Sequence, residues 1–150
     1  MVGLSHVQSL VDQHSLAKGA LKLELTESVL VKNADVVQRF ITDLKERGVH
    51  LWVDDFGTGY SSLSYLHRFP VDGLKIDKAF VDNLTVDAND DAIARTVIAL
   101  GRGLGLEVLA EGVETEAQAE FLRQERCSEA QGYLFGRPMP AAQLMDFDRR

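Results

Sequence analysis

The stretch that decides the fold is Leu51-Trp-Val-Asp-Asp-Phe-Gly-Thr-Gly-Tyr-Ser-Ser-Leu63. An apolar run from Val49 to Val53 predicts a buried strand, and it ends in two adjacent carboxylates, Asp54 and Asp55, where a glycine-bearing loop begins. Adjacent acids at a strand end can hold a divalent cation through their oxygens, because they can aim at two different points. A polar turn that happens to hold two Asp residues explains the dipeptide equally well. The rest of the chain favours the functional interpretation, because polar side chains also lie at or near the ends of other predicted strands.

Strand and helix patterns alternate along the chain. Strands are predicted to start near residues 21, 49, 73, 107 and 130, the last of them running over 130–135, with a short helix over 61–69 and a clear one over 89–104. The clear helix has an apolar stripe of Ile93, Val97, Ile98 and Leu104. The helix after the first strand has a buried stripe of Val36, Val37, Phe40, Ile41 and Leu44. Thr115 to Gln118 has the form of a capping box for a further helix. This alternation predicts parallel strands with right-handed crossovers, and hence an α/β fold: a partial TIM-type (β/α) barrel with about five strand–helix units.

Polar side chains recur at or near the predicted strand ends. They are Glu24, Asp54, Asp55, Lys75, Asp77, Glu111 and Gln131. Any one of them could belong to a turn or to a satisfied ion pair. In a (β/α) barrel, however, the strand ends form one face of the molecule, and such folds place their chemistry there. Purely structural roles, in turns or ion pairs, therefore explain the whole set poorly.

The composition indicates which ligands the chain can bind and where in the cell it is expected to be. The chain has 150 residues, 45% of them hydrophobic, which is enough for one domain with its own core. The net charge of -7 argues against binding a nucleic-acid polymer, so a phosphate-bearing ligand would need a metal to offset the acids. We see no signal peptide and no transmembrane segment, and we expect a cytoplasmic location. The single Cys127 is expected to be a half-buried structural thiol, and Trp52 is expected to pack in the core or against the loop.

Five motifs, in order, resemble those of a known family. They are Glu24-Leu-Thr-Glu27-Ser28, Asp54 to Leu63, Leu74-Lys-Ile-Asp77 with Phe80-Val81, Ala110-Glu-Gly-Val-Glu114, and Gln131-Gly-Tyr133 with Pro138. The family is that of EAL domains, the cyclic di-GMP phosphodiesterases. The resemblance runs from about Val7 onward, but the family's Glu-Ala-Leu segment and a following Asn, both metal ligands, have no counterpart here. It therefore implies that residues 1–150 are the C-terminal portion of a truncated EAL domain.

The resemblance also implies a set of metal ligands. Glu24 would bind a first metal, Asp54 would bridge two metals, and Asp55 would bind the second, whose site Glu111 would complete. The cofactors would be Mg²⁺ or Mn²⁺, in a two-metal site that is incomplete in this chain. Two cations bridged by a carboxylate can activate a water and also neutralise a phosphodiester.

Catalytic and supporting roles follow from the same resemblance. Lys75 would sit beside the attacking water and orient it or draw off its proton, and Gln131 would position water or substrate. Glu27, placed with these catalytic residues, and Glu114 would hold the glycine loop and nearby groups. Asp77 would support the site or simply pair with Lys75 or Lys78.

Three functions are compatible with these residues. The first is a hydrolase that converts cyclic di-GMP to linear pGpG in bacterial second-messenger signalling. The second is a catalytically inactive EAL-like module that binds the nucleotide or a protein partner. The third, a phosphoacceptor receiver with a doubly wound sheet, is disfavoured because its acidic pair belongs on the first strand. Self-association, or contact with other domains of a larger signalling protein, is expected.

Overall fold

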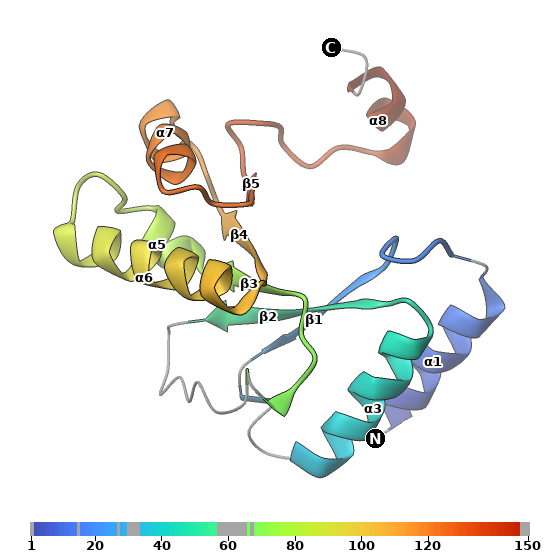
Figure 1. Ribbon diagram of the computed structural model, residues 1–150. Coiled ribbons are helices and arrows are strands. Elements are labelled where there is room, and N and C mark those ends of the chain that lie inside the picture. The colour runs from blue at the N-terminus through green and yellow to red at the C-terminus, as the bar shows by residue number, and fades with distance from the viewer. Residues whose placement is uncertain are drawn as a thin grey trace.

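The computed structural model describes residues 2–14, 16–26, 28–29, 34–56, 66 and 68–147. Within these residues, strands and helices alternate along the chain (Figure 1). The strands are β1 (Lys22–Thr26), β2 (His50–Phe56), β3 (Gly73–Ile76), β4 (Glu107–Glu111) and β5 (Glu129–Gln131). The helices are α1 (Val2–Gln13), α3 (Ala34–Glu46), α5 (Lys78–Val81), α6 (Ala88–Leu104), α7 (Glu116–Gln124) and α8 (Ala141–Phe147).

The strands form one parallel sheet in the order β1-β2-β3-β4-β5. Each begins within one residue of its predicted start, so the α/β class with five strand–helix units is confirmed. The order follows the sequence without reversal. A doubly wound sheet reverses direction at a switch point, and the structure therefore excludes the receiver interpretation.

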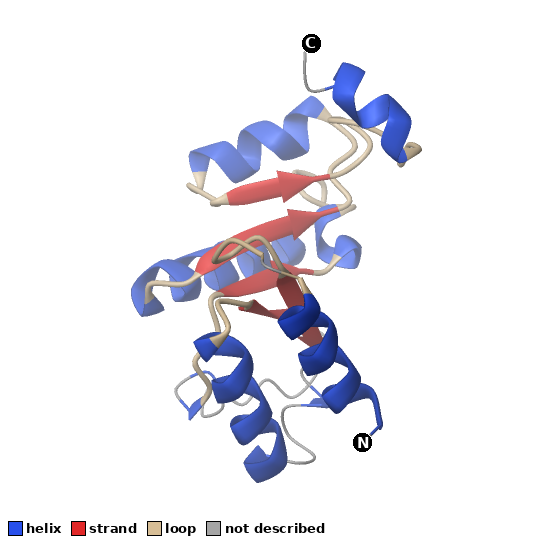
Figure 2. Cartoon of the chain, turned by 90° about the vertical axis from the view of Figure 1, so that its right-hand side faces the viewer, coloured by secondary structure: helices blue, strands red, loops and turns tan. Residues whose placement is uncertain are grey.

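Helices cover one face of this sheet. Helix α3 packs on β2, and α6 packs on β3 and β4, while α1 and α3 lie side by side at the end of the molecule opposite α8 (Figures 1 and 2). Alternate strand residues point towards the helices and are buried: Leu51, Val53, Leu74, Ile76, Val108 and Ala110. They meet the predicted apolar stripes of α3 (Val37, Phe40, Ile41, Leu44) and α6 (Val97, Ile98). The core thus lies between the helices and one face, and the other face carries Trp52 and the polar residues at the strand ends.

Three details differ from the sequence prediction. The last strand ends at Gln131 rather than near residue 135, because the backbone that follows bonds to Val113 instead of extending the sheet, with Leu134 N donating to Val113 O. Leu104 was expected in the buried stripe of α6 but is 48% exposed, since it occupies the last residue before Gly105 turns the chain. The four-residue helix α5 was not predicted. The helix predicted over 61–69 lies mostly outside the described residues.

Candidate active site

Four of the predicted site residues meet on the face of the sheet that the helices leave open. Lys75 on β3 is at the centre, with its side chain 4% exposed. Its Nζ lies 2.6 Å from Glu24 Oε2 on β1, 2.7 Å from Glu111 Oε1 on β4 and 3.5 Å from Asp54 Oδ1 on β2. Residues separated by up to 87 positions therefore form one cluster, which we call the acidic site: Glu24, Asp54, Lys75 and Glu111.

Strand register explains why these side chains share a face. Glu24 pairs with Trp52, which lies two residues before Asp54, and Trp52 pairs in turn with Gly73, two residues before Lys75. Since side chains alternate along a strand, each of these residues points to the same side of the sheet. The same alternation explains how a lysine is buried on a strand that also carries core residues.

The acids stabilise the charge on Lys75. Burial by itself lowers the pKa of Lys75, but hydrogen bonds with Glu111 and Glu24 raise it, and the net result is a pKa of about 12. The side chain is therefore an ammonium ion at neutral pH in this arrangement. It can donate hydrogen bonds to a water or a phosphate oxygen, and it has no lone pair with which to accept a proton.

Asp55 adopts an unusual backbone conformation near the end of β2. The register of β2 against β3 shifts between Val53 and Phe56, and Asp55 has a left-handed φ of 56°. Such a bulge re-aims a side chain, and Asp tolerates positive φ better than most residues. Burial, then the charge of Asp54 and a hydrogen bond with Asp77, raise the pKa of Asp55. Asp55 therefore contacts Asp77, while Asp54 contacts Lys75.

Asp77 and Gln131 lie beside these acids. The Asp77 carboxylate caps α5 by accepting a hydrogen bond from Ala79 N at 2.7 Å, in addition to its contact with Asp55. Gln131 Nε2 on β5 donates to Glu111 Oε1 at 2.9 Å. All five strands therefore contribute a side chain to this end of the sheet.

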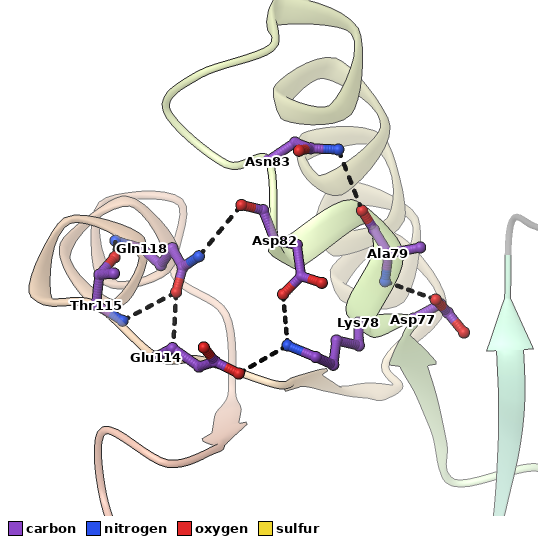
Figure 3. A network of polar contacts seen from close by, with 8 residues as sticks. All are labelled: Asp77, Lys78, Ala79, Asp82, Asn83, Glu114, Thr115 and Gln118. Atoms are coloured by element: carbon purple, nitrogen blue, oxygen red, sulfur yellow. Dashed lines mark hydrogen bonds and ion pairs between the residues drawn. The ribbon is translucent and has the colours of Figure 1, made fainter.

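A second polar network, which the sequence did not reveal apart from Glu114 and the capping box, braces the end of β4 (Figure 3). Lys78 Nζ lies 2.5 Å from Asp82 Oδ1 and 2.8 Å from Glu114 Oε1. Gln118, which is buried, accepts hydrogen bonds from the backbone N–H groups of Glu114 and Thr115. The backbone of Gly112 crosses so close to Lys78 that a Cβ there would lie 2.5 Å from Lys78 Cγ. These contacts hold the loop after Glu111 against α5.

A groove opens next to Glu111 and Gln131, with a volume of about 720 Å³. Apolar side chains supply much of its wall: Tyr133, Phe135, Pro138, Leu144 and Phe147. Arg137 lies over the ring of Tyr133, with 4.5 Å between the guanidinium carbon and the ring centroid. The sequence motifs included Tyr133 and Pro138, but the contribution of α8 has no signal in the sequence, because it depends on how the chain returns after β5.

The remaining predictions concern metal ligands, the glycine loop, Trp52 and Cys127. The oxygen donors of the acidic site suit Mg²⁺ or Mn²⁺. Across the described residues, no three His, Cys, Asp or Glu side chains are placed to hold one metal ion, and the acids gather around the Lys75 ammonium instead. Glu27 and the glycine loop lie outside the described residues. Trp52 is buried, and Cys127 is half-buried with its thiol donating to Val108 O at 3.3 Å, as predicted. None of the helices that the structure describes is both long and apolar enough to span a bilayer.

Known proteins resemble this chain over most of its length. The family model described as EAL domain matches residues 4–138. A protein of Pseudomonas aeruginosa, the bifunctional diguanylate cyclase/cyclic di-GMP phosphodiesterase MucR, is 50% identical over 139 residues, which are 93% of this chain and 20% of that protein. Its solved phosphodiesterase, in complex with c-di-GMP, matches with a TM-score of 0.87 and 49% identity over 94% of this chain and 57% of that one.

A manganese/cyclic di-GMP complex of BlrP1 from Klebsiella pneumoniae matches with a TM-score of 0.80 and 34% identity, over 90% of this chain and 36% of that one. The likeness to solved EAL domains confirms the predicted partial barrel. The chain spans about a fifth of the length of the first curated relatives.

Proposed function

The chain belongs to the EAL domain family, and on that premise we propose that it carries most of the active site of a cyclic di-GMP phosphodiesterase, which hydrolyses cyclic di-GMP to linear pGpG. The observation that carries this proposal is the convergence of Glu24, Asp54 and Glu111 on Lys75, at the carboxyl ends of four neighbouring strands. Parallel (β/α) folds place their chemistry at these ends.

We propose that the acids hold two divalent cations, Mg²⁺ or Mn²⁺. Glu24 would bind the first, Asp54 would bridge the two, and Asp55 and Glu111 would bind the second. The different contacts of the two neighbours, Asp54 with Lys75 and Asp55 with Asp77, support two positions rather than one. When bound, such cations polarise the phosphodiester and lower the pKa of a water. The manganese in the related BlrP1 complex is consistent with this assignment.

The contacts of Lys75 support its proposed place beside the attacking water. An ammonium ion that is held by acids on three strands can orient a water or a phosphate oxygen through its N–H groups. Gln131, which donates to Glu111, would position water or substrate beside it. Glu27, Glu114 and Asp77 would keep the surrounding loops in place, a role that the Lys78 network supports for Glu114.

The groove beside Glu111 is where we place part of the nucleotide. Aromatic rings and an arginine that lies over Tyr133 suit a flat heteroaromatic base, because bases stack on such surfaces. One guanine of cyclic di-GMP would lie there, with the scissile phosphodiester directed towards the acidic site.

We propose further that residues 1–150 form the C-terminal portion of a larger EAL domain. A closed barrel of this type has eight strands, whereas the described residues supply five, and the chain covers 57% of the solved MucR phosphodiesterase. The outer strands β1 and β5 each pair with one neighbour within the described residues, so additional strands can complete the sheet. Other domains of a larger signalling protein would be its partners.

An inactive nucleotide-binding module is the second candidate. It is favoured by one observation: among the residues that the structure describes, the acids surround the Lys75 ammonium, and no three acids are placed to hold one metal ion. Incubating the purified full-length protein with cyclic di-GMP and Mn²⁺, with a chelator as control, separates the two. Chromatography should detect pGpG only when metal is present. Binding of cyclic di-GMP without any product would favour the inactive module.

A further inference from the structure

An ion pair joins the two outer strands of the sheet. Lys22 on β1 and Glu129 on β5 lie 107 residues apart in sequence, yet Lys22 Nζ donates to both carboxylate oxygens of Glu129, at 3.0 and 3.1 Å. Three strands separate β1 from β5 in the sheet. Side chains from the two outer strands can meet only if the sheet curls, so the pair marks the curvature of the open face.

The Trp52 ring contacts the Lys22 ammonium of this pair. Lys22 Nζ lies 4.3 Å from the centroid of the Trp52 ring, which is 1% exposed. The ring packs against the backbone of Gly73 on β3, where a Cβ would lie 2.7 Å from it. A cation above a buried aromatic face is attracted by the π electrons of the ring, so Lys22 has a preferred position as well as a partner.

The pair lies one layer of side chains away from the acidic site. Glu24 follows Lys22 by two residues on β1, and Gln131 follows Glu129 by two residues on β5, so each pair shares a face of its strand at a separation of roughly 6–7 Å. Glu24 contacts Lys75, and Gln131 contacts Glu111. The curvature that joins Lys22 to Glu129 is therefore the curvature that brings both outer strands to the acidic site.

We propose that Lys22 and Glu129 are positioning residues for the acidic site. Their ion pair, seated on Trp52, holds β1 and β5 at the separation that lets Glu24 act together with Asp54 and Glu111. Neither side chain would touch the substrate. The inference rests on the proposed function, since it takes the three acids as ligands of divalent metal.

Binding of Mn²⁺ to the full-length protein, measured by titration calorimetry in the absence of nucleotide, tests this role. Lys22→Met and Glu129→Gln should each weaken binding by about threefold to tenfold, the range expected for a partly exposed pair that adds an aromatic contact. The double variant should be no weaker than the weaker single variant, because both changes remove the same contact. Lys22→Arg keeps the charge and should bind Mn²⁺ within about twofold of the unmodified protein.

Arg95→Met provides a matched control. Arg95 also joins two elements through an ion pair, with its Nε 2.8 Å from Glu125 Oε1, and it also lies over an aromatic ring, Phe121, at 4.9 Å. This pair belongs to the helical layer, so its loss should leave the affinity for Mn²⁺ unchanged. Circular dichroism checks that each variant is folded, and if Lys22→Met fails to fold, Glu129→Gln still tests the role.

Two results would overturn the role of the pair: unchanged affinity in folded Glu129→Gln, or additive losses in the double variant. An Arg95→Met loss as large as that of Lys22→Met would do the same. Asp54→Asn distinguishes this failure from failure of the proposed function. If Asp54→Asn abolishes Mn²⁺ binding while the pair variants do not affect it, only the positioning role is wrong. If Asp54→Asn binds Mn²⁺ normally, the metal site itself is wrong.

Discussion

Replacement of Lys75 by Met should destabilise the protein in the absence of metal. The change removes the positive charge that Glu24, Asp54 and Glu111 share, and it leaves the three carboxylates facing one another. Breaking a fully buried ion pair costs about 3–5 kcal/mol, whereas an exposed one contributes about 0–1 kcal/mol. Lys75 is 4% exposed but the acids are 47%, 25% and 23% exposed, so we expect a loss of about 1–3 kcal/mol.

Thermal unfolding of the full-length protein with and without Mn²⁺ measures this effect. For a domain of this size, at about 2–4 °C per kcal/mol, the loss corresponds to a fall in Tm of roughly 2–12 °C. Mn²⁺ should raise the Tm of Lys75→Met more than that of the unmodified protein, because bound cations relieve the repulsion that the ammonium otherwise offsets. Lys45→Met is the control. Lys45 pairs with the single acid Asp72 and is 28% exposed, so its loss should be smaller and independent of Mn²⁺.

Kinetics separate the catalytic role of Lys75 from its structural one. If the ammonium orients the attacking water, Lys75→Met should lower kcat far more than it weakens binding of cyclic di-GMP. Equal losses in both would make Lys75 a partner for substrate charge. A folded Lys75→Met protein with unchanged Tm in the absence of metal would refute the electrostatic reasoning.

Three further predictions concern the cap of α5, the thiol and the isolated chain. Asp77→Ala removes the side chain that caps α5, so it should destabilise the fold by about 0.5–2 kcal/mol in thermal unfolding. It should reduce Mn²⁺-dependent hydrolysis of cyclic di-GMP only modestly. Loss of all turnover would instead make Asp77 a metal ligand. Burial raises the pKa of the Cys127 thiol, so its reaction with a disulfide reagent should be slow at neutral pH. The reaction rate should still rise with pH where the rate of an ordinary thiol has levelled off. A rate equal to that of the unfolded chain would contradict this prediction. The isolated 150-residue chain should self-associate in light scattering and lack phosphodiesterase activity, because within the described residues β1 and β5 each have one unpaired edge. A monodisperse monomer that hydrolyses cyclic di-GMP would disprove this prediction.

Strand periodicity accounts for what the sequence could predict. Leu51 and Val53 point to the helices, while Trp52 and Asp54 point to the open face, and this alternation is visible in the sequence as soon as a strand is assumed. The strand starts and the acids at the strand ends followed from it. The apolar stripes of α3 and α6 were equally clear, because helices of 13 and 17 residues repeat the pattern over several turns.

What the sequence could not predict depends on contacts between distant segments. The ion pair of Lys22 with Glu129 needs the curvature of the whole sheet, and neither residue lies in a motif. The four residues of α5 are too few to show a period, and Asp77 initiates this helix only because the chain turns after β3. The left-handed backbone of Asp55 accompanies a register shift between β2 and β3, which no property of the Asp-Asp dipeptide reveals.

Hydrolysis of cyclic di-GMP by the Asp54→Asn variant tests the central claim most directly. Asp54 is isosteric with Asn, lies 3.5 Å from Lys75 and is the residue proposed to bridge two cations. Measured in the full-length protein with saturating Mn²⁺, the variant should keep its fold and produce no detectable pGpG, while the unmodified protein converts cyclic di-GMP to pGpG. Substantial turnover by Asp54→Asn would contradict the bridging role and the two-metal site built upon it.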